Sequence, residues 1–75
     1  MPHITVKLAL GRYSETDKTR LAEELVKDVV AITGCREESV SVVIEEVASS
    51  DWAEKVYRAE ILDNPAIYKK PGYTL

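Results

Sequence analysis

The first residues of the chain alternate between apolar and polar side chains, as they do in a half-buried strand. Over residues 3–10, one face of such a strand carries only apolar side chains, namely Ile4, Val6, Leu8 and Leu10. The other face carries Thr5, Lys7 and Ala9. Gly11 then interrupts the alternation. The pattern therefore predicts a strand over residues 3–10 with one face toward the core.

The segment after Gly11 changes to the spacing of a helix. Ser14 and Asp17 are placed for a capping box, in which their side chains satisfy backbone N–H groups of the first turn. A broad apolar stripe follows at helical spacing, through Leu21, Leu25, Val29 and Ile32. Gly34 stands where a left-handed residue commonly ends a helix. These signals predict one long helix that can lie on a sheet.

A second strand is predicted over residues 40–47, where Val40, Val42 and Ile44 share one face. Strand, long helix and strand make a βαβ unit, in which the two strands are parallel and the crossover is right-handed. One helix leaves the other sheet face and the sheet edges open. We therefore expect a single α+β domain over residues 1–75 that associates into a homo-oligomer of low order.

The last third of the chain predicts a short second helix and a terminal strand. Residues 49–51 open the helix, and its apolar stripe is Ala53, Val56, Tyr57 and Ile61. Asn64-Pro65 ends it, because the residue before a proline disfavours helical geometry. In the tail, residues 66–75, a turn is expected at Pro71-Gly72 with a short strand near the end.

Composition narrows the class of protein. Apolar residues make up 45% of the chain and charged residues 31%, which is typical of a globular domain. The net charge of −3 argues against a nucleic-acid binder, and no apolar run approaches a membrane span. The single cysteine, Cys35, fits a reducing cytoplasm. With one Cys and one His, we expect no protein-bound zinc.

Pro2 is the first candidate for chemistry. An initiator methionine is normally removed before a residue as small as proline, and the chain would then begin with a free secondary amine. Desolvation beside apolar side chains lowers the pKa of such an amine toward neutrality, which suits a general base. If Met1 stayed in place, the Pro2 nitrogen would be acylated and could not act as a base.

Two further side chains are candidates for binding a substrate. Arg12 follows the first strand, and its planar guanidinium suits a carboxylate; the alternative is a solvated surface arginine. Trp52, the only tryptophan, begins the second helix, and it could serve packing instead. His3 adjoins Pro2 but is expected to point to the other face of the strand. The neighbours Glu45 and Glu46 should diverge in the same way and so form no acid–base pair.

These features follow one another in an order typical of a known family. The chain presents Pro2, a strand, the Gly11-Arg12 pair, a capped helix and the strand at residues 39–46. This order resembles the tautomerase superfamily, in particular its 4-oxalocrotonate tautomerase branch. The opening Met-Pro-His-Ile, Trp52 and residues 69–73 are more similar still to the PptA-type small tautomerases. The resemblance covers nearly the whole chain.

The resemblance implies a fold, an activity and roles for three residues. It implies a βαβ protomer whose dimer forms a four-stranded sheet and which uses no cofactor. Pro2 would be the general base, Arg12 would bind the substrate carboxylate, and Trp52 would form an apolar wall. The reaction would be enol–keto tautomerisation of a 2-oxo acid, and thus that of an isomerase.

One position departs from the family pattern. The 4-oxalocrotonate enzymes carry a second arginine in the second strand, and this chain has Ser41 there. A monocarboxylate substrate is then easier to accommodate than a dicarboxylate, unless Lys7, Arg36 or Arg58 replaces the missing cation. The long tail favours a dimer over a hexamer.

Two alternatives to a tautomerase stay open at this stage. One is a non-catalytic oligomeric module, in which Arg12 and Trp52 serve packing. The other is a dehalogenase or decarboxylase activity of the same superfamily, which uses a protonated Pro2. The pKa of the Pro2 amine separates the second alternative from the base hypothesis.

Overall fold

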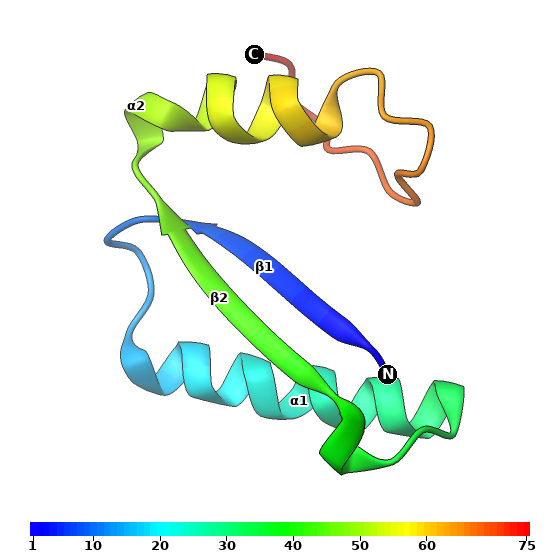
Figure 1. Cartoon of the computed structure of the whole chain (residues 1–75). Coiled ribbons are helices and arrows are strands. Elements are labelled where there is room, and N and C mark those ends of the chain that lie inside the picture. Colours follow the sequence, from blue (N-terminus) through cyan, green and yellow to red (C-terminus); the bar gives the residue numbers. More distant parts are fainter.

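The chain folds around a small parallel sheet (Figure 1). The computed structural model describes all 75 residues. Its elements are β1 (His3–Ala9), α1 (Glu15–Thr33), η1 (Glu37–Ser39), β2 (Ser41–Val47), α2 (Ser49–Trp52) and η2 (Ala53–Ile61). β1 pairs with β2 in parallel, from His3 opposite Ser41 to Ala9 opposite Val47. The predicted βαβ unit is confirmed, and β1 ends one residue earlier than predicted.

The helix α1 begins and ends where the sequence predicts. The Ser14 hydroxyl accepts a hydrogen bond from the Asp17 N–H at 3.0 Å, and the Asp17 carboxylate accepts one from the Ser14 N–H at 3.3 Å. Gly34 ends the helix with φ of +74°, a conformation that glycine adopts without steric cost. Both caps are therefore confirmed.

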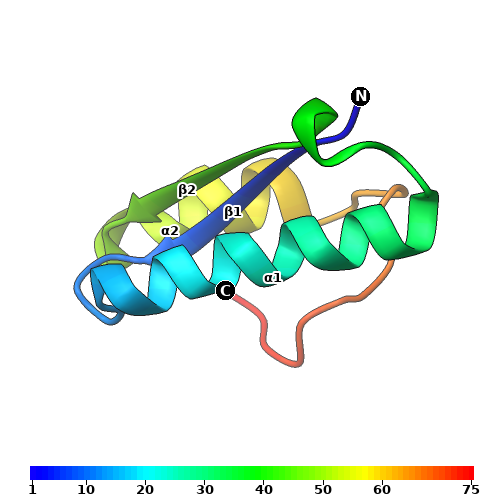
Figure 2. The ribbon, with the colours of Figure 1, turned by 90° about the horizontal axis from the view of Figure 1, so that it is seen from below.

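The two faces of the sheet have different neighbours. α1 covers the face that carries the apolar side chains of β2, and Ala22 of α1 lines the same grooves as Val42 and Ile44. The opposite face carries His3 and Lys7 from β1 with their partners from β2. Figure 1 and Figure 2 show the second helical segment on this other side of the sheet, away from α1. The chain is thus layered as helix, sheet and helix.

The second helical segment starts as α-helix and continues as π-helix. α2 contributes four residues and η2 nine. The Leu62 N–H reaches the Tyr57 carbonyl at 2.7 Å, a five-residue step that is characteristic of a π-turn. The predicted helix is confirmed, but its π geometry was not predicted. None of the helices combines the length and the apolar composition that a membrane span needs.

The predicted terminal strand is wrong for the single chain. Residues 66–75 form no strand, and the sheet contains β1 and β2 alone. Instead, the tail is held against the second helical segment by Tyr73. Its hydroxyl accepts a hydrogen bond from Trp52, and its ring centroid lies 5.7 Å from that of Tyr57. These side-chain contacts place the tail against a helix and not beside a strand. The tail therefore has no strand edge with which its backbone could pair.

The single chain leaves an unusual amount of its surface open. Only Val56 and Tyr57 are buried, and the accessible surface is 5942 Å². A compact monomer of the same mass exposes about 4,600 Å². The excess, on the order of 1,300 Å², exceeds the roughly 800 Å² that each partner buries in a standard interface. The fold is therefore suited to association with further copies.

Candidate functional site

Pro2 lies at the amino end of the sheet. Its carbonyl accepts a hydrogen bond from the Ser41 N–H at 3.2 Å, which extends the pairing of β1 and β2 by one residue. Met1 is fully exposed ahead of it. The peptide bond between the two residues is therefore open to an aminopeptidase.

Arg12 lies in the loop that connects β1 to α1, and this loop is anchored on both sides. The Leu10 N–H donates to the Val47 carbonyl at 2.9 Å, and the capping box of Ser14 fixes the start of α1. Gly11 allows the tight turn with φ of +82°. The Arg12 side chain is exposed, and no carboxylate of the chain pairs with it. Its guanidinium is thus free to bind an anion.

Glu46 connects this loop to the rest of the molecule. Its carboxylate pairs with the Lys18 ammonium at 2.6 Å, and the two side chains are 24% and 16% exposed. The hydrogen bond from Lys18 holds the pKa of Glu46 below its ordinary value, and a bond from the Gly11 backbone lowers it further. Bonds to Glu46 and Glu15 raise the pKa of Lys18. The two charged groups therefore brace the turn that carries Arg12.

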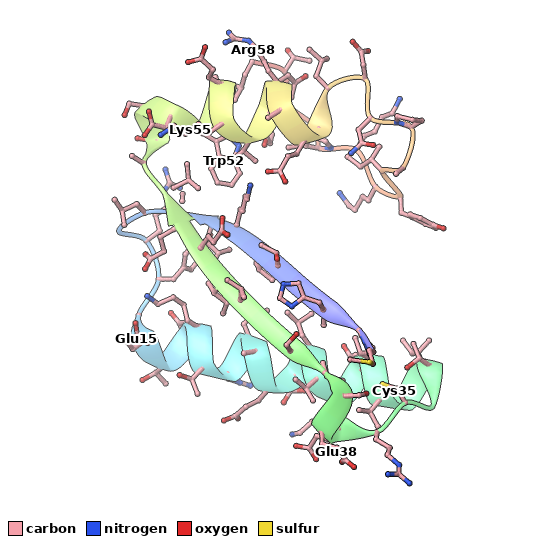
Figure 3. The ribbon with its side chains drawn as sticks, in the orientation of Figure 1. Glu15, Cys35, Glu38, Trp52, Lys55 and Arg58 are labelled. Carbon is pink, nitrogen blue, oxygen red and sulfur yellow. The ribbon has the colours of Figure 1, made fainter.

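Trp52 lies at the end of α2, and its indole projects from the helix toward the sheet (Figure 3). The indole N–H donates a hydrogen bond to the Tyr73 hydroxyl at 2.9 Å. Tyr73 thereby sets the orientation of Trp52. The sequence does not reveal this contact, because no local spacing links positions 52 and 73.

The three predicted site residues do not meet within one chain. Because β1 and β2 are parallel, the loop of Arg12 and the helix of Trp52 both follow the carboxyl end of the sheet. Pro2 lies at the other end, separated by the length of β1, about 20 Å. None of the four cavities on the chain is lined by Pro2, Arg12 or Trp52.

The cations considered as substitutes for a second arginine are engaged or turned outward. Lys7 pairs with Glu60 and lies 4.0 Å from Glu45, and the bond to Glu60 raises the pKa of Lys7. Arg36 pairs with a neighbouring carboxylate on the surface. Arg58 projects away from the sheet in Figure 3. None of these three side chains therefore offers a free cation to Pro2 within the single chain.

The adjacent carboxylates of β2 diverge as the sequence predicts. Glu45 faces Lys7 on the sheet face away from α1, whereas Glu46 faces Lys18 on the face that α1 covers. They do not form an acid–base pair. The sheet face away from α1 carries a further contact at the amino end of the sheet, where the His3 ring lies 2.6 Å from the Ser41 hydroxyl. The sequence pattern did not reveal this contact.

Comparison with known proteins decides the family. The family model for the tautomerase enzymes matches residues 2–57, from Pro2 to the middle of η2. The chain belongs to the tautomerase family. A probable tautomerase of Xylella fastidiosa is 39% identical to this chain. The alignment covers 97% of this chain and 89% of the Xylella protein. Tautomerase PptA of Cronobacter sakazakii is 36% identical over the full length of both chains, and that of Escherichia coli is 28% identical over the same span.

Membership of the tautomerase family gives the class of reaction but not the substrate or the role of each residue. Pro2, Arg12 and Trp52 all lie within the matched part of the chain. The chain is a tautomerase-type isomerase with the expected βαβ fold. The resemblance to PptA-type tautomerases that the sequence suggested is confirmed.

Replacing Glu46 with Gln should lower the stability of this tautomerase at neutral pH but not in acid. The pKa of Glu46 in the folded state lies below its ordinary value of 4.5. Its ion pair with Lys18 therefore stabilises the fold above that pH, and the contribution is lost as the pH falls through the lower folded-state pKa. Thermal unfolding of Glu46→Gln and wild type should differ at about pH 7 and converge in acid, below the folded-state pKa of Glu46.

Glu24→Gln is the matched control, because Glu24 pairs with Lys27 at 3.4 Å on the exposed side of α1. An exposed pair of this kind contributes little. A Glu46→Gln deficit of the same size at every pH would contradict the assignment.

Replacing Tyr73 with Phe should free the Trp52 indole and loosen the tail. The variant keeps the ring against Tyr57 but loses the hydroxyl that accepts the indole N–H. Emission of the single tryptophan should shift, and the free energy of unfolding should fall by about 0.5–1.5 kcal/mol. Tyr68→Phe is the control, because Tyr68 is fully exposed. Identical spectra for Tyr73→Phe and wild type would show that the bond is absent in solution.

Proposed function

We propose that this protein is a cofactor-independent enol–keto tautomerase acting on a 2-oxo acid or its enol, with Pro2 as the general base. The observation that supports the proposal most is the match to the tautomerase family beginning at Pro2. The fully exposed Met1 supports it as well, because removal of Met1 creates the free amine.

In the proposed reaction, the lone pair of the Pro2 nitrogen takes the proton from the enol hydroxyl. The oxygen electrons form the carbonyl, and the C=C electrons take a proton back from the Pro2 ammonium at the carbon two bonds away. No atom or electron is gained or lost overall. Arg12 binds the carboxylate in two hydrogen bonds and stabilises the negative charge that develops on the oxygens. Trp52 provides an apolar wall.

We propose further that two copies complete each site. A two-fold axis between the free edges of two β1 strands makes them antiparallel, so that the amino end of one lies beside the carboxyl end of the other. Neighbouring strands are about 4.8 Å apart. The amine of Pro2 would then lie near Arg12 of the partner subunit. The large open surface of the single chain supports this homodimer with a four-stranded sheet.

The substrate we propose is a monocarboxylate, such as an aryl or alkyl enolpyruvate. Arg12 is a free cation at the proposed site, whereas Lys7 already faces Glu45 and Glu60. At the amino end of the sheet, the polar side chains of His3 and Ser41 contact each other. A second carboxylate would lack a partner and would lose its hydration on binding.

Replacing Pro2 with Ala should remove most of the tautomerase activity. The variant keeps a free amine but changes it from secondary to primary and releases the ring that fixes its direction. We expect kcat for ketonisation of an enolpyruvate to fall at least about 100-fold, in the range of a lost general base. Intact mass spectrometry of both proteins verifies that each begins at residue 2.

Arg12→Lys and Arg12→Ala complete the experiment. KM for the enolpyruvate should rise in both and more in Arg12→Ala, since Lys keeps the charge but loses the two-bond geometry. Wild-type rates in Pro2→Ala, or native protein that retains Met1 while active, would contradict a Pro2 base. Activity that rises only as Pro2 becomes protonated would support the dehalogenase or decarboxylase alternative.

A further inference from the structure

The first pair of residues in the sheet is joined by its side chains as well as by its backbone. His3 lies directly opposite Ser41. The His3 Nδ1 atom lies 2.6 Å from the Ser41 hydroxyl oxygen, on the sheet face that α1 does not cover. The Ser41 N–H also donates to the Pro2 carbonyl at 3.2 Å. Ser41 therefore holds both residues that follow Met1.

No other side chain at the start of the chain forms a hydrogen bond. Among the first six residues, His3 alone makes a side-chain hydrogen bond. The next polar contact on this face is that of Lys7, four residues further along β1, and it is directed at Glu45 and Glu60. Chain termini fray unless something fixes them. The contact between His3 and Ser41 is thus the one side-chain hydrogen bond that adds to the backbone pairing of the first residues.

A base at a chain terminus is sensitive to such order. Proton transfer needs the nitrogen within about 2.6–3.2 Å of the proton-bearing atom. A displacement of about 1 Å can lower a rate by about 100-fold. After removal of Met1, the direction of the Pro2 amine is set by the backbone at residues 2 and 3, which is the segment that Ser41 holds.

We propose that His3 and Ser41 are a positioning pair that fixes the Pro2 amine for proton transfer. This inference rests on the proposed function of Pro2. His3 acts through its Nδ1 atom on Ser41 and not on the substrate. Ser41 acts through its hydroxyl on His3, while its backbone N–H holds Pro2 directly.

Substitutions of His3 separate positioning from direct catalysis. His3→Asn places an amide atom close to the position of Nδ1 and can keep the bond to Ser41, whereas His3→Ala removes it. His3→Gln places its amide near the position of the other ring nitrogen, Nε2. We expect kcat to fall about tenfold in His3→Ala and His3→Gln with KM changed less than about twofold. His3→Asn should stay within about twofold of wild type.

Substitutions of Ser41 test the other half of the pair. Ser41→Ala should lower kcat as much as His3→Ala, and Ser41→Thr, which keeps the hydroxyl, should restore it. The double variant His3→Ala/Ser41→Ala should be no slower than either single variant, because one bond is lost in all three. Both side chains are exposed, so thermal unfolding should show all variants folded.

A second readout does not depend on turnover. The rate at which 3-bromopyruvate alkylates the Pro2 nitrogen, followed by mass spectrometry of the amino-terminal peptide so that alkylation of the free Cys35 is counted separately, reports how well the amine is presented to a 2-oxo acid. We expect the rate to fall in His3→Ala and Ser41→Ala and to recover in His3→Asn and Ser41→Thr.

The outcomes distinguish this inference from the proposed function. An active wild type with unchanged kcat and alkylation in His3→Ala and Ser41→Ala would overturn the positioning pair alone. Loss of activity in His3→Asn with wild-type rates in Ser41→Ala would also overturn it, since His3 would then act on the substrate itself. An inactive wild type with a free Pro2 would overturn the proposed function.

Discussion

The parallel pairing of β1 and β2 is the constraint on which the rest of the structure depends. A helix must cross over between two parallel strands, so α1 occupies one face of the sheet. The same pairing brings the two amino ends to one end of the sheet and the two carboxyl ends to the other. A proposed base at the start of β1 and a proposed anion-binding residue after its end are therefore separated by the full strand. If Pro2 and Arg12 act together as proposed, a second copy must bring them to one site.

The two ends of the sheet are ordered by different interactions. At the carboxyl end, the ion pair of Glu46 with Lys18 and the capping box of Ser14 fix the turn that carries Arg12. Tyr73 holds the indole of Trp52 at the same end. At the amino end, the contact between His3 and Ser41 is the one side-chain hydrogen bond. The proposed functional residues at each end of the sheet are therefore held by side-chain contacts.

The elements β1, α1 and β2 could be predicted because their signals are local. Apolar alternation defines a strand within a few residues, and Ser14 and Gly34 mark helix ends by backbone chemistry alone. The π-helix could not be predicted, because the apolar spacing from Ala53 to Ile61 suits an α-helix equally well. The terminal strand was wrong because the contacts of Tyr73 with distant residues, and not the local pattern, direct the tail. The pair of His3 and Ser41 depends on strand register, and alternation determines only the face.

Whether two copies share one site is tested most directly by mixing two variants that each lack one group of the proposed site, assayed at an enolpyruvate concentration well below KM. Pro2→Ala and Arg12→Ala chains, unfolded together in equal amounts and refolded, form mixed dimers in about half of the cases. If the amine of Pro2 works with Arg12 of the partner subunit, each mixed dimer contains one intact site. The account predicts about a quarter of wild-type activity per chain from this mixture. Activity that stays at the level of the separate variants, with mixed dimers verified by mass, would contradict it.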